Sequence, residues 1–198
     1  MRRIITVLLI SLFFLAVYIG LKSFLYKPKR VSATSVINAM PATVYASLTV
    51  PLKLQEWQPE VIEIETDDLN SGFTQGGIYT QHVRAGERIF PISMEIKEMV
   101  ANEKLSVYLK SGGFESALDY YLASKGAQGQ KTALTVSQEI DFYHPLARAA
   151  GDFLVQKLES SLKVSLERLI AHYSNAITQP TTPTVNSSEE IDSLSATN

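Results

Sequence analysis

An uninterrupted apolar run near the N-terminus constrains this chain more than any other feature. The 18 residues from Ile4 to Leu21 contain no charged side chain. As a helix rising about 1.5 Å per residue they span roughly 27 Å, which is close to the hydrocarbon thickness of a bilayer. Tyr18 and Tyr26 lie where such a helix would meet the membrane interface. The sequence therefore predicts an uncleaved membrane anchor.

Two other interpretations of the run stay open, a cleaved signal peptide and a buried core helix. Arg2 and Arg3 resemble the basic start of a signal peptide. The run is longer than a usual signal-peptide core, however, and four basic residues separate it from the nearest small-residue site at 31–33. A core helix fits less well because the run is apolar on every side.

Basic residues flank both ends of the run, so the charge rule for membrane orientation leaves the side of the following domain open. We expect a single-pass membrane protein of the bacterial inner-membrane type, with the membrane itself as a partner. The oligomeric state stays open as well.

Charge is distributed unevenly along the chain, although its formal net value is only −2. The first 30 residues hold six of the 18 basic residues and no acid, so the other 168 carry 12 basic and 20 acidic side chains. An acidic domain argues against nucleic acid as a partner. The chain contains no cysteine, which excludes disulfides, thiolate metal sites and a cysteine nucleophile.

Composition and pattern divide the chain into three segments. Residues 1–30 form the anchor and a basic juxtamembrane segment, and residues 31–173 form the folded domain. Residues 174–198 are rich in Ser, Thr, Asn and Pro and contain no basic residue, which predicts a disordered tail.

Within the domain the period of the apolar residues changes in a definite order. A β-prone run at 31–38 precedes a helix that begins at Pro41, and Pro51 ends that helix and opens a second short one. Alternating segments separated by tight turns then predict antiparallel strands. These strands are expected at 61–66, 78–84, 89–100, 105–110, 114–123 and 132–142.

The pattern changes to a helical period after His144 and Pro145, which predicts one continuous helix to about Tyr173. Its apolar residues recur every three or four positions and should form one buried stripe. A concave face of a curved antiparallel sheet is the expected partner of so long a helix. The stripe consists of Leu146, Ala150, Phe153, Leu154, Leu158, Leu162, Leu166, Leu169 and Tyr173.

Several segments of the domain resemble one known superfamily. The segments SVINA (35–39) and PATVY (41–45), Trp57 with Pro59, and the helix at 153–169 resemble the START-like superfamily, also called SRPBCC or polyketide cyclase/dehydrase-like. The resemblance implies an α+β helix-grip fold, in which a curved antiparallel sheet of about seven strands wraps around the C-terminal helix and encloses a cavity. Members include lipid carriers, hormone and allergen-type binders, aromatases/cyclases and quinone-associated proteins, so the ligand stays open.

The sequence carries no motif of the common catalytic classes. There is no HExxH, no G-x-S-x-G and no phosphate-binding loop, and the three histidines lack the spacing of a metal site. His144 fits a helix cap, and His172 fits a cation in a last helical turn. His82 and Arg84 share a strand face that is either the polar end of a pocket or solvated, and the alternation of the strand favours solvated. We therefore assign no catalytic residue and expect no metal, no cofactor and no enzymatic activity.

The residues most suited to bind a ligand lie on the last strands and the long helix. Gln138 and Tyr120 are polar residues on otherwise apolar strand faces, where a buried polar group needs a partner. That partner is either a ligand or another group of the protein. The candidates for the cavity wall are Leu134, Val136, Ile140, Phe153 and Leu158.

Three functions are compatible with this organisation. The first is a membrane-tethered module that binds a hydrophobic small molecule such as a lipid, an isoprenoid or a quinone-like compound. The second is a cyclase or dehydratase, which would need ionisable groups converging on the cavity. The third is an interaction module without a pocket. The volume and polarity of the pocket discriminate the three, and we favour the first.

Overall fold

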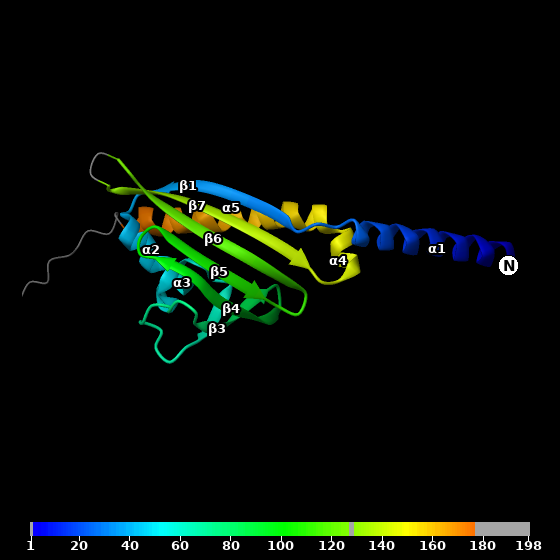
Figure 1. The fold of residues 1–198 in the computed structure, drawn as a ribbon, viewed down its shortest axis with the longest axis horizontal. Helices are drawn as coiled ribbons and strands as arrows, with labels where there is room; N and C mark the ends of the chain where they lie inside the picture. Colours follow the sequence, from blue (N-terminus) through cyan, green and yellow to red (C-terminus); the bar gives the residue numbers. More distant parts are fainter. Residues whose placement is uncertain (1, 127–128, 177–198) are drawn as a thin grey trace, which may run out of the picture.

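A computed structural model of the protein describes residues 2–126 and 129–176 (Figure 1). Of the tail predicted at 174–198, residues 174–176 continue the last helix, and 177–198 lie outside the described residues. The N-terminal helix α1 (Arg2–Phe24) projects from one end of the domain (Figure 1). Its segment Ile4–Phe24 is the one described helix long and apolar enough to cross a membrane, and none of that span is buried.

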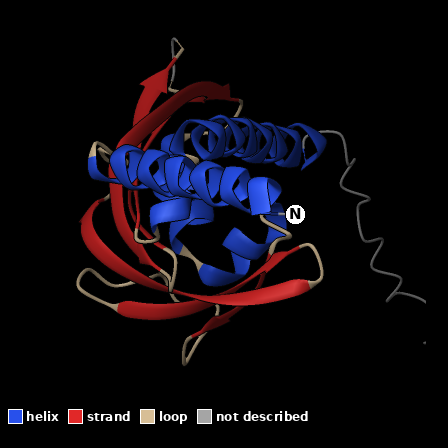
Figure 2. Cartoon of the chain, turned by 90° about the vertical axis from the view of Figure 1, so that its right-hand side faces the viewer, coloured by secondary structure: helices blue, strands red, loops and turns tan. Residues whose placement is uncertain are grey.

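The domain contains a seven-stranded antiparallel sheet, which confirms the predicted sheet of about seven strands. The strand order is β1-β7-β6-β5-β4-β3-β2. The first strand therefore pairs with the last, and Lys29 lies opposite Ile140. Figure 2 shows the sheet curving around the helices. The strands are β1 (Lys29–Ile37), β2 (Val61–Glu65), β3 (Ile78–Ala85), β4 (Arg88–Val100), β5 (Lys104–Lys110), β6 (Phe114–Lys125) and β7 (Lys131–Phe142).

Two short helices, α2 (Pro41–Thr49) and α3 (Pro51–Trp57), follow β1 and cover the end of the sheet far from α1 (Figure 1). Each begins at a proline, whose missing N–H costs nothing in a first helical turn. Trp57 is buried, and its indole Nε1–H donates to the carbonyl of Ser47 at 3.0 Å. Trp57 therefore packs in the apolar core.

The C-terminal helix was expected to be continuous from Pro145, and this expectation is wrong. A break at Ala150 separates the five-residue helix α4 (Pro145–Ala149) from the long helix α5 (Gly151–Ala176). A Cβ atom at Gly151 would lie 3.0 Å from Cε2 of Tyr26. The Tyr26 ring thus occupies the space that a side chain at the start of α5 would need.

The apolar core lies between the inner face of the sheet and the second half of α5. Leu166, Leu169 and Tyr173 are buried there, while Leu146 and Phe153 are 67% and 58% exposed. The predicted stripe is therefore buried only in its C-terminal part. Among the described elements, the first turns of the helix have no layer of protein over them comparable to α2 and α3.

Candidate functional site: a cavity between the sheet and α5

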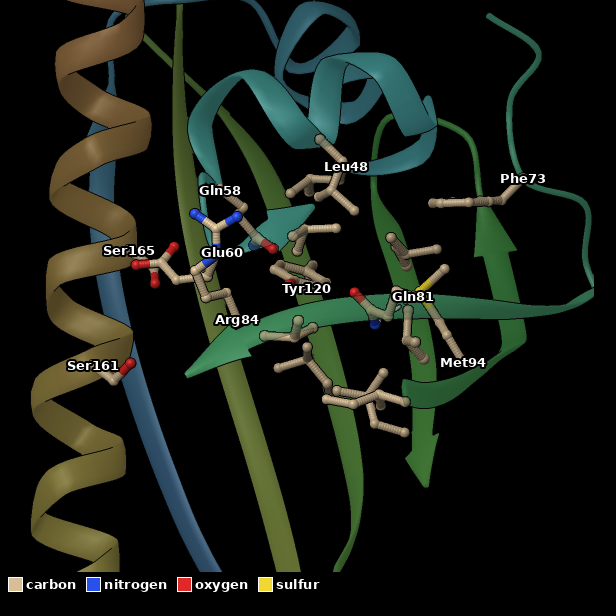
Figure 3. Close-up of a pocket in the computed structure, with 18 of the residues that line it drawn as sticks. Leu48, Gln58, Glu60, Phe73, Gln81, Arg84, Met94, Tyr120, Ser161 and Ser165 are labelled. Carbon is tan, nitrogen blue, oxygen red and sulfur yellow. Dashed lines mark hydrogen bonds between the residues drawn. The ribbon is translucent and has the colours of Figure 1, made fainter. Parts of the chain in front are cut away.

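A cavity of about 380 Å³ opens between the inner face of the sheet and α5 (Figure 3). Its volume lies in the range of small-molecule sites, which is about 300–1,000 Å³. Most of its wall is apolar and comes from strands β2 to β6. The lining residues are Leu48, Leu54, Gln58, Glu60, Val61, Phe73, Gln81, Val83, Arg84, Ala85, Ile92, Met94, Leu105, Val107, Leu109, Leu118, Tyr120, Ser161 and Ser165.

Two neutral polar side chains lie inside the cavity, Tyr120 from β6 and Gln81 from β3 (Figure 3). The Tyr120 hydroxyl makes no hydrogen bond with any described residue, and burial raises the pKa of this phenol, which keeps it protonated. The Gln81 amide is buried and donates only a weak hydrogen bond to the Met94 sulfur at 3.6 Å. Both groups are therefore available to a ligand that carries an uncharged polar atom.

The mouth of the cavity is polar and is formed by three elements. Ser161 and Ser165 lie one turn apart on α5, and the segment before β2 contributes Gln58 and Glu60 (Figure 3). Arg84, at the end of β3, adds a guanidinium that forms no ion pair with the described residues. The polarity of the site thus increases from the interior to the opening.

One ion pair joins the mouth to the long helix. The guanidinium of Arg168 on α5 donates a hydrogen bond to the Glu60 carboxylate. Partial burial opposes ionisation of Glu60, but the hydrogen bond and the charge of Arg168 outweigh it and lower the pKa of the carboxyl group. Glu60 is therefore ionised at neutral pH and is already engaged by a cation.

The seven residues predicted to bind a ligand do not lie together. Tyr120 lines the cavity, whereas Leu134, Val136 and Ile140 are buried in β7 outside its lining. The Gln138 amide donates to the Ser116 hydroxyl at 3.0 Å, so its partner is another residue of the protein.

The two candidates on the helix also lie outside the lining of the cavity. Leu158 is half-buried, and Phe153 is exposed with the Lys157 ammonium 5.0 Å from its ring centre. Of the seven predicted residues, Tyr120 is therefore the one that lines the cavity.

Sequence reasoning missed Gln81, the two serines of α5, Gln58 and Glu60, and it gave Arg84 a place in a pocket only as the less favoured alternative. Gln81 lies between Tyr79 and Val83 on the strand face that alternation assigns to the interior. The same signal that singled out Gln138, a polar residue in an apolar row, would have found it. No comparable signal marks Ser161 and Ser165, because serines on a helix usually face solvent.

The histidines occupy structural positions in the described part of the chain. The Nε2 atom of His82 lies 2.9 Å from the Glu65 carboxylate on the outer side of the sheet, and His172 lies 3.5 Å from Glu56. His144 precedes α4 at the capping position, but its side chain makes no capping hydrogen bond. No cluster of potential metal ligands occurs among the residues the structure describes.

Solved structures with the same architecture come from several bacteria. A START superfamily protein of Mycobacterium smegmatis is 14% identical, with a TM-score of 0.61 over 74% of this chain and 98% of its own. A conserved protein of Geobacillus kaustophilus is 12% identical, with a TM-score of 0.59 over 75% and 97%. Protein CV1439 of Chromobacterium violaceum is 18% identical, with a TM-score of 0.57 over 73% and 96%. At these identities the likeness shows the fold alone.

No curated protein matches the sequence of the chain. A family model described as "Polyketide cyclase / dehydrase and lipid transport" matches residues 28–174. This span covers β1 to the last turn of α5 and most of the chain. The chain therefore belongs to the polyketide cyclase/dehydrase and lipid transport family and has the helix-grip fold of the START superfamily.

Proposed function

We propose that this protein is a membrane-tethered module that binds one hydrophobic small molecule in the cavity between the sheet and α5. The observation that carries the proposal is the chemistry of the cavity interior. Its wall is apolar except for the Tyr120 hydroxyl and the Gln81 amide, neither of which has a strong partner among the described residues. A molecule with an apolar body and an uncharged polar group, such as a lipid, an isoprenoid or a quinone-like compound, fits this lining.

The apolar helix α1 supports the tethering half of the proposal. A molecule of this kind partitions into bilayers, so a binding module gains from being held at the membrane surface. No residue of the span Ile4–Phe24 is buried in the protein, unlike a core helix of a soluble domain. In this proposal residues 1–30 anchor the domain and remain attached to it.

A cyclase or dehydratase is the second candidate, since the family includes such enzymes by description. Proton transfer would require a base or acid within reach of the bound molecule. Tyr120, Glu60 and Arg84 are the ionisable residues of the lining, and of these only Tyr120 lies in the interior, where it is held neutral. Glu60 is at the mouth and paired with Arg168, so binding is favoured over catalysis.

Mass spectrometry of the full chain extracted from membranes in mild detergent tests the proposal. We expect one hydrophobic molecule per chain in the native protein. Leu118→Trp should abolish its retention, because the indole would fill the space that the Leu118 side chain borders. Tyr121→Trp is the matched control, since the neighbouring Tyr121 is exposed and lies outside the lining of the cavity.

The Tyr120 hydroxyl gives a second test of the same site. Tyr120→Phe should weaken binding of the extracted molecule by about 2- to 12-fold, the equivalent of one hydrogen bond of about 0.5–1.5 kcal/mol. Folding stability should be unchanged, because that hydroxyl bonds to no described residue. An empty native protein would contradict the binding proposal, and chemical conversion of the bound molecule would favour the cyclase.

A further inference from the structure

The end of the domain from which α1 projects is held close to the anchor. Five residues after α1, β1 begins at Lys29. Between them, the Tyr26 hydroxyl donates to the carbonyl of Ile140 at 3.2 Å, and the Arg148 guanidinium lies 5.6 Å from the centre of its ring. The connection is therefore short and packed on β7 and α4, so this end of the domain stays near any membrane that α1 crosses.

Antiparallel pairing brings the β3–β4 turn to the same end. Strand β1 starts at this end, and each neighbouring strand runs in the opposite direction. Strands β7 and β5 therefore end here, and β6 and β4 start here. Residues 88–92 of β4 extend past the end of β5, whose last residue Lys110 pairs with Ser93. We define the anchor-proximal end as residues 85–90, which join β3 to β4, together with α4 and the first turn of α5.

The anchor-proximal end exposes four large apolar side chains. Ile89 and Phe90 on the hairpin are 55% and 41% exposed, and Leu146 and Phe153 on the helices are 67% and 58% exposed. Such residues on one end of a soluble domain normally mark an interaction surface. A transmembrane helix tilts by about 20° on average, and a tilt toward the hairpin would bring Ile89 and Phe90 nearer to the headgroup layer.

An apolar row connects this end to the cavity on the sheet side. Phe90 pairs with Val83, and Ile92 pairs with Gln81, so both face the same side of the sheet as those cavity residues. Exposure falls along the row from Phe90 through Ile92 to the buried Met94.

A matching pair lies on α5. Leu158 and Leu154 are half-buried and share a helical face with Ser161 at the mouth. Leu158 lies one turn nearer the anchor than Ser161, and Leu154 lies two turns nearer. Apolar side chains thus line both sides of the path from the anchor-proximal end to the cavity.

Charge at this end is complementary to anionic lipid. A hollow of about 290 Å³ between α1 and the domain is lined by Lys22, Lys27, Lys29 and Arg148, against the single acid Asp152. Lys29 pairs with Asp152 at 2.9 Å and Arg148 with Asp141 at 3.5 Å, whereas Lys22 and Lys27 form no ion pair with the described residues. Clusters of lysine and arginine beside a membrane helix attract anionic headgroups.

We propose that the anchor-proximal end is a second membrane contact, in which Ile89, Phe90, Leu146 and Phe153 enter the headgroup layer and the basic hollow holds an anionic lipid headgroup. This contact rests on the proposed function in requiring that α1 stays attached and spans the bilayer. It directs the path between β4 and α5 toward the bilayer, so a hydrophobic molecule passes between membrane and cavity along an apolar surface.

Spin labels on single cysteines test this contact in the full chain. The natural sequence has no cysteine, so each introduced one is the only label site. We would label Ile89→Cys, Leu146→Cys and Phe153→Cys in nanodiscs that contain phosphatidylglycerol. Ile78→Cys is the matched control, because Ile78 is 70% exposed at the opposite end of β3.

The measurement compares how strongly each spin label is relaxed by oxygen and by a water-soluble nickel complex. Labels at Ile89, Leu146 and Phe153 should relax more with oxygen, which concentrates in lipid, than with a water-soluble nickel complex. The label at Ile78 should show the reverse order. An aqueous label at Ile89 overturns the proposal whatever the other two show, because the hairpin is the part that α1 does not itself hold at the membrane.

The lipid composition tests the basic hollow. In nanodiscs of phosphatidylcholine alone the Ile89 label should be shallower, and Lys22→Gln with Lys27→Gln should give the same loss in phosphatidylglycerol. Equal depth in both lipids overturns the assignment of the hollow to anionic headgroups. The depth measurement needs no ligand in the cavity, and a cleaved anchor would appear first as a shortened chain mass, so failure of the proposed function is distinguishable.

Discussion

The two halves of α5 repeat the same spacing of apolar residues and bury them to different extents. In the second half, Leu166, Leu169 and Tyr173 are buried against the sheet and the short helices. In the first half, Phe153 is exposed, and Leu154 and Leu158 are half-buried. The periodicity is therefore a property of the helix alone, whereas burial depends on the elements that cover it.

The difference follows from where α2 and α3 pack. They close the grip at the far end, where the Tyr173 hydroxyl donates to the carbonyl of Thr43 at 3.0 Å and also hydrogen-bonds Ser47. Near α1 no described element plays that part. The C-terminal half of α5 is consequently a fixed part of the core, while the N-terminal half presents apolar surface beside the mouth of the cavity.

Truncation of one apolar side chain in each half should break the comparison most clearly. Leu169→Ala removes a fully buried side chain and should lower the free energy of unfolding by about 2–5 kcal/mol. Phe153→Ala should change it by less than about 0.5 kcal/mol in detergent, because the ring is already exposed. Chemical denaturation followed by circular dichroism measures both. Equal losses would mean that the first half of α5 is covered as well.

The hydroxyl of Tyr173 sharpens the comparison at the closed end. Tyr173→Phe leaves Ser47 and the Thr43 carbonyl without this partner and should cost about 1–3 kcal/mol of unfolding free energy. Tyr121→Phe is the control, because Tyr121 is exposed on the outer face and its ring contact with Lys104 survives. If the two substitutions had the same small effect, the hydrogen bonds between Tyr173 on α5 and α2 would contribute nothing to the free energy of unfolding.

The Glu60–Arg168 pair ties the second half of α5 to the mouth of the cavity and should have the smallest effect. Its side chains are 44% and 40% exposed, so solvent screening limits its contribution to at most about 1 kcal/mol. The folded-state pKa of Glu60 is below its ordinary value of 4.5, so the contribution is present above that pH and is lost as the pH falls through the folded-state pKa.

Arg168→Met should therefore lower stability near neutral pH and flatten the acid side of the stability profile. Lys163→Met, which removes another cation from α5, should keep the acid-side loss, because Glu60 stays paired. Urea titrations between neutral pH and the acid limb measure the difference. A profile for Arg168→Met that parallels the native one would contradict the role of this pair.

The order of helices and strands could be predicted because each local sequence pattern favoured one type of element. Pro41 and Pro51 begin α2 and α3 as expected, and the switch from alternation to helical period marks the end of β7. Two features depended on contacts that sequence does not show. The first residue of α5, Gly151, lies against the ring of Tyr26, 125 residues away, where a side chain would be crowded. A bulge in β2 turns Val61 and Ile64 inward while Ile62 is exposed.

The cavity was harder to predict than the fold. Alternation assigns Leu134 and Val136 on β7 and Leu118 and Tyr120 on β6 to the same inner face, and all four do lie on it. Only the last two border empty space. Helix α5 packs over β1, the neighbour of β7, and covers that side of the sheet. A sequence pattern tells inside from outside, but it does not distinguish a filled interior from a hollow one.

The pairing of β1 with β7 delays completion of the sheet until late in synthesis. Residues 29–37 leave the ribosome next to the apolar helix, but their partners at 132–140 are about 100 residues further along the chain. At synthesis rates of about 5–20 residues per second, β1 waits roughly 5–20 s for β7. During that interval its N–H and C=O groups lack a strand, a state prone to wrong pairing. Completion of this domain is thus a late event of translation, and a chain stalled before β7 would present an open strand beside the apolar helix α1.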